Sequence, residues 1–257
     1  MTAIQTVVQQ IDQLLATAEI PDYEPALNGL QLVNRGTVHR VAAAVDFSTE
    51  AIEQAVAVGA DMLLVHHGMF WAGLQPITGT RYRRLQLAMQ HDLAVYVSHL
   101  PLDYHATLGN NAQLVARLGL VPDGRFGRFR SIELGFTGSS DMSTADLAAR
   151  VRAFAQPLGT QLVTSPFLPE RRTRRWAVLT GAGGSSDVLE EASSRGVDTL
   201  IVGEGPHHTA VDARERGIVM MYAGHYATET LGVQALAAEL ERQFALPWTF
   251  LHLPTGL

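Results

Sequence analysis

The chain reads GADMLLVHH over residues 59–67 and GVDTLIVGE over residues 196–204. In each stretch a glycine suited to end a helix is followed by an acid and an apolar run of strand length. A second matching pair follows, SHLPLD over residues 98–103 and GHYATE over residues 224–229, where a histidine precedes an acid by four positions. This repetition predicts two copies of one supersecondary unit, each with imidazole and carboxylate groups at the ends of strands.

The sequence around these stretches predicts alternating strands and helices, with helices of about ten residues, as in parallel crossover units. In the first copy we expect strands at 38–45, 62–65 and 93–98 and helices at 49–58, 80–91 and 110–118. In the second copy we expect strands at 176–180, 198–202 and 218–223 and helices at 187–194, 208–215 and 229–243. An amphipathic helix over residues 2–18 precedes both copies.

These patterns predict an α/β fold of two pseudo-symmetric half-domains with mostly parallel sheets and a metal cleft between them. Residues 1–123 form the first half, including the N-terminal helix, and residues 124–257 form the second. Within the second half, residues 124–175 supply extra strand–helix–strand elements and residues 176–257 form the internal repeat. Clustered proline and glycine predict a linker near residues 121–130.

Composition excludes several classes of protein. The chain has 257 residues, 47% of them hydrophobic and 17% charged, as expected for a folded globular protein. Its net charge of -6 provides no basic field for nucleic acid. Cysteine is absent and all 19 basic residues are arginine, which excludes disulfides, thiolate nucleophiles, Schiff-base lysines and P-loop nucleotide sites.

No targeting segment is expected from the N-terminal sequence, which lacks the charged start and apolar centre of a signal peptide. No apolar stretch reaches the roughly 20 residues that a membrane span needs. We therefore expect a cytoplasmic protein with no membrane partner.

Histidines and acids gather at or just after the predicted strand ends, where ligands bind in open parallel sheets. They are His66, His67, His99, Asp103, Glu204, His225 and Glu229. A lone histidine at such a position is more often structural than a ligand. Two adjacent histidines on a regular strand face opposite ways, so a shared metal requires the ladder to have ended, which Gly68 allows. If a helix begins near His225, the side chains of His225 and Glu229 share one helix face.

Imidazoles and carboxylates crowded into one site need a cation to neutralise them. Nitrogen and oxygen donors without sulfur suit Zn, Fe, Mn, Co or Ni. If about five of these seven residues are ligands, at least two of them carboxylates, they are too many for one tetrahedral zinc that must also hold a water. They fit two ions about 3.5–4 Å apart better. The spacing therefore predicts two divalent metal ions per subunit.

Two other features have simpler explanations. The glycine-rich run 181–186 follows a strand and precedes a helix, but it lacks the third glycine and the later acid of a dinucleotide fingerprint. We interpret it as a tight turn and expect no cofactor-binding residues there. Asp46 is either an ordinary cap or a group that orients a histidine ligand.

The motifs together resemble a known family over about residues 4–245. They are NGLQ at 28–31, Val45-Asp46, His66-His67, SHLPLD at 98–103, Gly203-Glu204 and GHYATE at 224–229. The family is that of the Nif3-like dinuclear metal-centre hexameric proteins, also known as type 2 homologues of GTP cyclohydrolase I. The resemblance implies a duplicated α/β fold, a toroidal homohexamer built as a trimer of dimers, and two metal ions per subunit.

By this resemblance the metal ligands are His66, His67, Asp103, His225 and Glu229. The remaining pocket candidates, whose catalytic role is unknown, are His99, Glu204 and Asp46, with His99 close behind the ligands. The chain departs from the family at Gly68, where relatives often have proline, and at Tyr226, where some have a second histidine. Neither departure removes a proposed ligand.

The resemblance implies a metal-dependent hydrolase that uses a metal-bridged water. Its reaction would be of the GTP cyclohydrolase type 2 kind or a phosphoester hydrolysis, on a small-molecule or nucleotide substrate. The alternative is a non-catalytic metal-binding ring, acting as a scaffold or in metal handling. A nucleic-acid clamp is a third hypothesis that rests on ring shape alone, and the acidic composition weighs against it.

Overall fold

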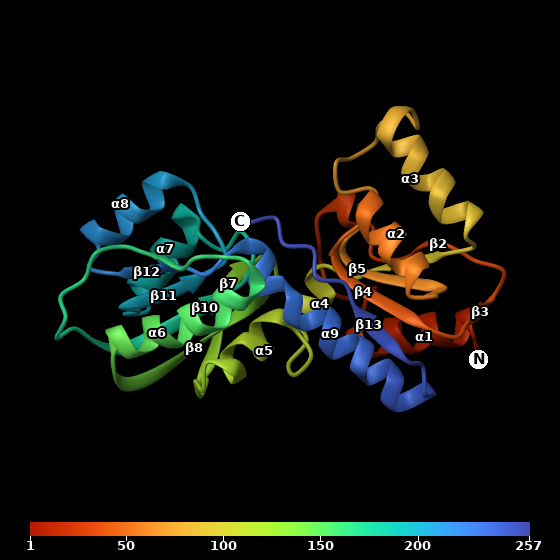
Figure 1. Ribbon diagram of the computed structural model, residues 1–257. Coiled ribbons are helices and arrows are strands. Elements are labelled where there is room, and N and C mark those ends of the chain that lie inside the picture. Colours follow the sequence, from red (N-terminus) through yellow and green to blue (C-terminus); the bar gives the residue numbers. More distant parts are fainter. The chain divides into compact units, whose positions relative to one another are not determined.

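The computed structural model describes residues 1–257, which form two compact units (Figure 1). Unit 1 comprises Met1–His105 and Gly232–Leu253, and unit 2 comprises Ala106–Leu231 and Pro254–Leu257. These bounds differ from the predicted boundary at residue 123. One reason is that the helix at Asn110–Arg117 packs against strands of unit 2. The other is that the last strand of the chain completes the sheet of unit 1.

The elements of unit 1 alternate as the sequence predicts. In chain order they are β1 (Thr2–Ala3), α1 (Ile4–Leu15), the 3-10 helix η1 (Glu24–Ala26), β2 (Gly29–Leu32), β3 (Thr37–Val38), β4 (Val41–Asp46), α2 (Thr49–Ala57), β5 (Met62–His67), α3 (Gly79–Gln90), β6 (Ala94–Val97), α4 (Leu100–Tyr104), the part of α9 (His225–Phe244) from Gly232 onward, and β13 (Trp248–Phe250). The N-terminal helix is shorter than the predicted 2–18, because Ala16 takes a left-handed conformation (φ 50°) that ends it.

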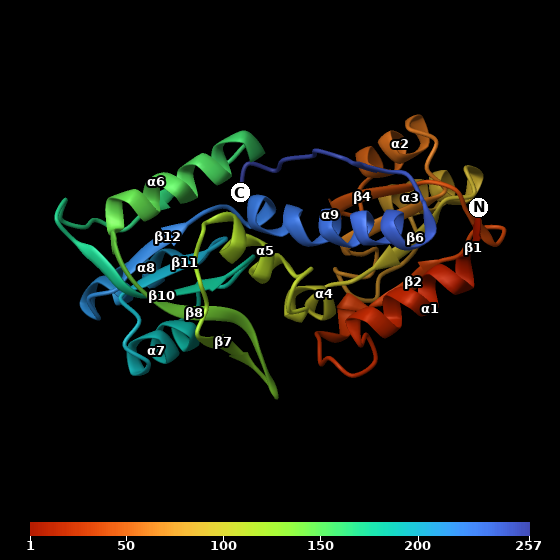
Figure 2. The same ribbon diagram turned by 90° about the horizontal axis from the view of Figure 1, so that it is seen from below.

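The main sheet of unit 1 has the order β13-β4-β5-β6-β2. Its first four strands are parallel, and β2 joins β6 in the antiparallel sense. Helices α2 and α3 lie on one face of this sheet, while α1 and the unit-1 part of α9 lie on the other (Figures 1 and 2). The crossover helix α2 begins at Thr49, as predicted, and the hydroxyl of the preceding Ser48 accepts a hydrogen bond from the amide of Ala51, a cap worth about 1 kcal/mol.

Unit 2 contains the second repeat and the extra elements. In chain order these are α5 (Asn110–Arg117), β7 (Gly124–Phe129), β8 (Ile132–Ser143), α6 (Thr144–Ala155), the 3-10 helix η2 (Gln156–Leu158), β9 (Val163–Thr164), β10 (Arg172–Leu179), α7 (Ser186–Ser194), β11 (Thr199–Val202), α8 (His207–Glu215), β12 (Val219–Tyr222) and the first turns of α9. The predicted linker near 121–130 is wrong. Residues 124–129 form β7, which pairs along its length with β8.

The sheet of unit 2 has the order β7-β8-β10-β11-β12-β9. The repeat strands β10, β11 and β12 are parallel, as predicted. The extra strands β7, β8 and β9 all join this sheet in the antiparallel sense, so the sheet is mixed. The antiparallel pairing of β7 and β8 follows from their short hairpin turn, in which Arg130 has a positive φ of 51°.

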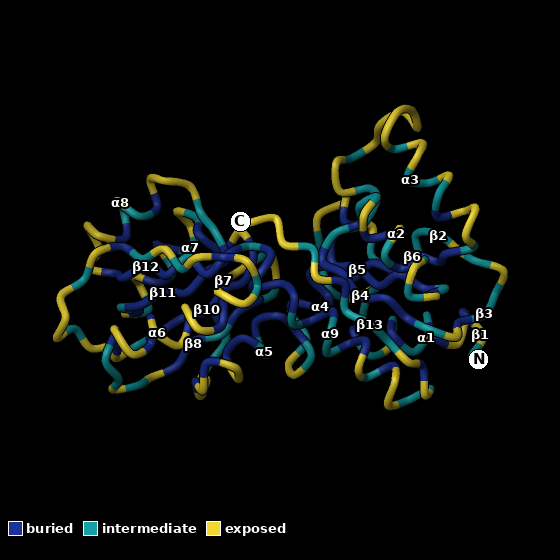
Figure 3. The backbone as a smooth tube through the Cα atoms, in the orientation of Figure 1, coloured by how far each residue is buried: buried dark blue, intermediate teal, exposed yellow.

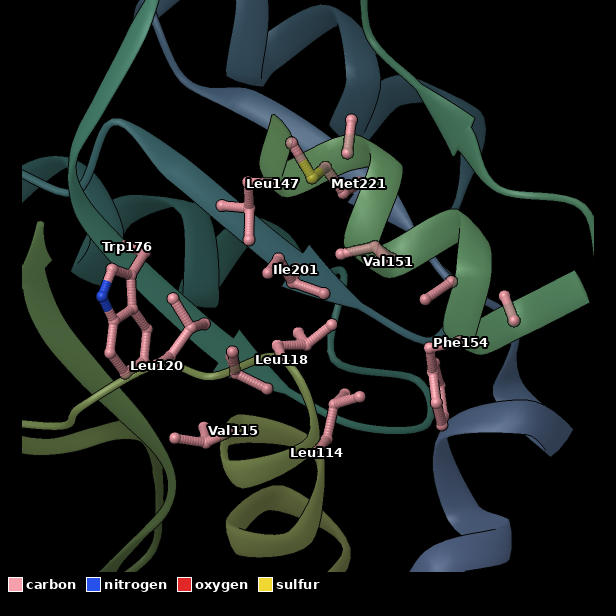
Figure 4. Packing of buried hydrophobic residues seen from close by; sticks show 14 of the residues in the cluster. Leu114, Val115, Leu118, Leu120, Leu147, Val151, Phe154, Trp176, Ile201 and Met221 are labelled. Atoms are coloured by element: carbon pink, nitrogen blue, oxygen red, sulfur yellow. The ribbon is translucent and has the colours of Figure 1, made fainter. Parts of the chain in front are cut away.

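A buried apolar cluster between the sheet and helices α5 and α6 holds unit 2 together (Figure 4). Trp176 and Ile201 of the sheet pack against Leu114 of α5 and Val151 of α6, and all four side chains are fully buried. Truncating one such side chain to alanine typically costs about 2–5 kcal/mol. This core fixes the parallel strands whose carboxyl ends carry the glycine-rich turn, Glu204 and His225. None of the helices is long and apolar enough to span a lipid bilayer.

Candidate metal centre

The paired histidines are the last two residues of β5. Pairing of β5 with β6 stops at Val65 and Val97, whereas pairing with β4 continues to His67, opposite Asp46. The strand pairing that was expected to end at the histidines therefore ends on the β6 side of β5 but not on the β4 side. This is enough to bring the two rings together, with centroids 4.8 Å apart. His66 is fully buried and His67 is 9% exposed.

Each of these rings has its Nδ1 atom engaged by an acceptor. His66 Nδ1 donates to the carbonyl oxygen of Ser98 at 2.9 Å. Because a carbonyl can only accept, the proton of a neutral His66 ring lies on Nδ1 and the lone pair lies on Nε2. His67 Nδ1 lies 2.9 Å from Oδ1 of Asp46, which orients that ring in the same way. Asp46 therefore contacts a predicted ligand, as one of its two interpretations required.

His99 is held by a carboxylate that the sequence analysis missed. Its Nδ1 atom lies 2.8 Å from Oδ1 of Asp22. The second oxygen of Asp22 accepts from Asn28 Nδ2 at 2.7 Å and from the amide of Leu100 at 2.9 Å. Burial raises the pKa of Asp22, but His99, Asn28 and the Leu100 amide outweigh it and leave the pKa below its ordinary value. Asp22 is therefore an ionised acceptor, and His99 carries its proton on Nδ1.

The three histidines form a single cluster at the carboxyl ends of β5 and β6. The ring of His99 lies 4.9 Å from that of His66 and 5.6 Å from that of His67. The three rings can each offer one nitrogen such that these atoms all lie within 4.8 Å of one another. The indole of Trp71 covers the cluster, 5.0 Å from the His67 ring and 4.6 Å from the His99 ring. The ring of His99, which the sequence analysis placed close behind the ligands, thus lies directly beside the rings of the predicted ligands His66 and His67.

Asp103 reaches the same cluster from helix α4. Its Oδ2 atom lies 3.6 Å from Nε2 of His66, and both side chains are almost completely buried. With its proton on Nδ1, His66 presents a lone pair to this carboxylate. Two electron-rich groups in such an arrangement are stabilised by a cation between them.

In unit 2 a histidine lies between two carboxylates. Helix α9 begins at His225, so His225 and Glu229 share a helix face as the spacing predicted, with Nε2 and Oε2 3.1 Å apart. Nδ1 of His225 lies 2.9 Å from Oε1 of Glu204, which directly follows the β11–Gly203 strand end. Burial lowers the pKa of His225, but Glu229 and Glu204 outweigh it and raise the pKa to about 9.

The glycine-rich turn after β10 makes room for this pair. Gly181 has a positive φ of 61°, and a Cβ at this position would overlap Oε1 of Glu229. Its amide donates to Oγ1 of Thr228, one residue before Glu229, at 3.0 Å. The turn that resembled a weak dinucleotide fingerprint is thus a close approach of backbone to the carboxylate of Glu229.

The donors in both units suit a divalent transition metal. Four histidines, His66, His67, His99 and His225, each have Nδ1 bound to a carboxylate or a carbonyl. Metal-ligating histidines almost always have this second contact, which fixes the tautomer and directs Nε2 to the metal. Imidazole nitrogen and carboxylate oxygen are donors for Zn, Fe, Mn, Co and Ni. The residues therefore fit the predicted kind of ion.

Sequence reasoning identified the histidines and acids but missed part of their support. Asp22, Asn28 and Trp71 were not singled out as site residues, although Asn28 begins the quoted NGLQ motif. Asp22 lies in an irregular segment 77 positions before His99, so no local spacing connects the two. Trp71 lies in the loop after the paired histidines, where only its proximity in sequence to His67 is a signal.

Fold and site together define a class of α/β proteins that hold histidine–carboxylate clusters, suited to metal ions, at the carboxyl ends of parallel strands. The model of the Duf34/NIF3 (NGG1p interacting factor 3) family matches residues 2–255. The chain therefore belongs to the Duf34/NIF3 family.

Relatives and solved structures agree with this assignment. The chain is 38% identical to a protein of Deinococcus radiodurans over 252 residues, which cover 97% of this chain and 93% of that protein. It is 39% identical to a protein of Pseudomonas aeruginosa, with 98% of each chain covered. Both relatives are named GTP cyclohydrolase 1 type 2 homolog. The structure of TTHA1606 from Thermus thermophilus is similar over 100% of both chains, with 35% identity and a TM-score of 0.87.

Proposed function

We propose that the protein is a metal-dependent hydrolase in which His66, His67, Asp103, His225 and Glu229 bind a pair of divalent metal ions. The observation that carries the proposal is the contact of Nδ1 in His66, His67 and His225 with a carbonyl or carboxylate oxygen, which directs each Nε2 toward a metal ion. When bound, two such ions lower the pKa of water and polarise the bond under attack.

The chain itself supplies orientation and a proton acceptor. Asp46 and Glu204 hold the rings of His67 and His225. The Asp22–His99 pair has the arrangement of a general base with its orienting acid, because the ionised carboxylate fixes the proton on Nδ1 and leaves Nε2 to accept another. We propose that His99 takes up the proton released by the attacking water. Trp71, over the rings of His67 and His99, limits access of bulk water.

The names of the relatives suggest a substrate with a purine ring, such as GTP, and a phosphoester is the second class that the donors suit. The test is turnover of nucleotides, phosphoesters and cyclic amides by protein whose metal content has been measured. We expect His66→Ala and Glu229→Ala to lose metal and activity together while the protein stays folded. A full metal complement in either variant would contradict the ligand assignment.

A third variant tests whether His99 acts as a general base or as a metal ligand. His99→Gln should retain its metal and lose most turnover, since general base catalysis contributes about 100- to 10,000-fold. Loss of an ion in this variant would make His99 a ligand instead. If metal-loaded wild-type protein turns over none of the substrates and its ions have no open coordination position, the non-catalytic metal-binding role is correct.

The predicted homohexamer and the predicted sharing of one metal pair by both sets of ligands remain proposals. The mass in solution, compared with 27.9 kDa for one chain, tests the first. Metal stoichiometry tests the second. If both sets serve the same two ions, His66→Ala and Glu229→Ala should each weaken binding of the same ions, with no set keeping an ion of its own.

A further inference from the structure

Unit 1 contains a small pocket beside helix α3. Helix α3 and the loop before it are mostly exposed (Figure 3). Together with Gln31 and Leu32 of β2 and with Phe47 after β4, they line a cavity of about 230 Å³. None of the histidines and acids of the candidate metal centre lines this cavity. We call it the α3 pocket.

The lining of the α3 pocket combines apolar surface with positive charge. Eight of its twelve lining residues are apolar, and its only charged ones are Arg81 and Arg84. Three of the apolar side chains are largely exposed: Leu74 (100%), Met89 (61%) and Ile77 (59%). A ligand with an apolar body would cover such side chains, which is favourable in proportion to the apolar area removed from water. Two cations without an acid in the lining favour a ligand that is also anionic.

Arg84 has donors without acceptors. Its Nη1 atom donates to the carbonyl of Phe47 at 3.0 Å, which is its only hydrogen bond, and it forms no ion pair. Its Nε atom is buried without a partner. The guanidinium carbon lies 5.7 Å from the centroid of the Phe47 ring, so the group is held over that ring. An anion that accepts from the free N–H groups stabilises such a cation, and the planar guanidinium matches the geometry of a carboxylate.

Arg81 has a different task, because its donors hold the wall of the pocket. Its Nη1 atom donates to the carbonyls of Gly73 and Gln75, each at 3.3 Å, and its Nη2 atom donates to that of Met69 at 3.4 Å. The amide of Met69 in turn donates to Oε1 of Gln31 at 2.9 Å. These contacts fix the loop between β5 and α3, so the pocket exists before a ligand binds. Arg84 is thus the cation of the pocket whose donors are mostly free.

We propose that the α3 pocket binds a small monocarboxylate with an apolar body, whose carboxylate accepts from Arg84 and whose body packs against Phe47 and Leu85. The volume of about 230 Å³ is below the roughly 300–1,000 Å³ of pockets for drug-sized ligands, which selects a small molecule. One guanidinium with free donors balances one negative charge, which suits a carboxylate better than a phosphate dianion. The inference does not depend on the metal ions.

The test is calorimetric titration of the full chain with phenylacetate and with hexanoate. The protein is treated with EDTA, because a carboxylate also binds metal ions. We expect saturable binding of at least one of these probes. Phenylacetamide, which has the same body without the charge, and acetate, which has the charge without the body, should each bind at least ~10-fold more weakly. High salt should weaken binding of the carboxylates but not that of phenylacetamide.

Matched variants locate the binding. Arg84→Met should lose at least ~10-fold in affinity for the carboxylate. Arg83→Met makes the same change at the neighbouring, exposed position outside the lining and should bind as wild type does. If Arg84→Met does not fold, Ile77→Asp decides, because this exposed lining residue then repels carboxylates more than phenylacetamide.

Three results would each overturn the proposal. They are no saturable binding of either probe by the wild type, equal affinities for phenylacetate and phenylacetamide, and wild-type affinity in the Arg84→Met variant.

Discussion

Gly181 lies so close to Glu229 that the carboxylate occupies the space a side chain would need. A Cβ at position 181 would overlap Oε1 of Glu229, and the amide of Gly181 binds Thr228 in the preceding position. The glycine-rich turn after β10 therefore sets the position of a proposed metal ligand.

Gly181→Ala should displace Glu229 and weaken metal binding nearly as much as Glu229→Ala does. The substitution also strains a backbone at φ 61°, which costs about 1–2 kcal/mol of stability. Gly59→Ala is the matched control, because Gly59 has φ 71° with nothing near its missing Cβ. Calorimetric metal titration of both variants separates the effect of the overlap with Glu229 from the effect of backbone strain. Equal metal affinities in the two would show that the overlap has no effect on the site.

Asp46→Asn should weaken metal binding about 10- to 100-fold, because the carboxylate that orients His67 is replaced by a neutral amide. Another histidine–aspartate pair provides the comparison: His39, whose side chain is exposed, lies 2.6 Å from Asp61. Asp61→Asn removes a similar charge just before the first residue of β5, at the opposite end of this strand from the paired histidines, and should leave metal affinity unchanged. Affinity that is insensitive to Asp46→Asn would argue against His67 as a ligand.

Trp71 should report binding of a metal to the first cluster. Its ring lies 5.0 Å from the ring of His67, so an open-shell ion such as Co²⁺ bound by this histidine should quench the indole fluorescence. Titration of metal-free protein should show saturable quenching that EDTA reverses. Trp71→Phe keeps the other two tryptophans and should abolish most of the signal. Quenching that survives this substitution would place the ion elsewhere.

Stability of the metal-free protein should fall as the pH rises through about 9. The pKa of His225 is about 9 in the folded chain, compared with an ordinary value of 6.5. A raised pKa stabilises the folded state fully below about pH 6.5, and this contribution is lost as the pH passes the folded value. Thermal unfolding in EDTA from about pH 6 to pH 10 measures it. His225→Gln should remove this part of the dependence, and an unchanged profile would refute the assignment.

The sequence predicted most elements because their signals are local. Apolar runs identified α2 and the parallel strands, and the structure adds serine caps to α2 and α6, where Ser48 and Ser143 each accept a hydrogen bond from the backbone amide three residues later. The segment at 121–130 was misread because Gly124 and Gly127 were taken as loop residues. In the structure Gly127 has φ 77° inside β7, and a Cβ there would press on Leu179. Gly127 is therefore a strand residue that allows β7 to pack closely against Leu179.

Long-range relationships could not be read from local patterns. The three-residue strand Trp248–Phe250 has no periodicity of its own, and it is fixed by parallel pairing with β4 about two hundred positions earlier. Asp22 lies in a segment without regular structure and acquires its role only when His99 is placed beside it. The acids and histidines themselves were found, because they follow apolar strands directly.

The late position of β13 has a consequence for biosynthesis. Strand β4 pairs with residues 248–250, so one edge of its sheet stays uncovered until these residues, about two hundred positions later, have left the ribosome. Unpaired strand edges on nascent chains invite association with other chains. Unit 1 therefore cannot mature in vectorial order, although most of its residues are made first. A chain that stops before Trp248 should depend on chaperones far more than one that includes β13.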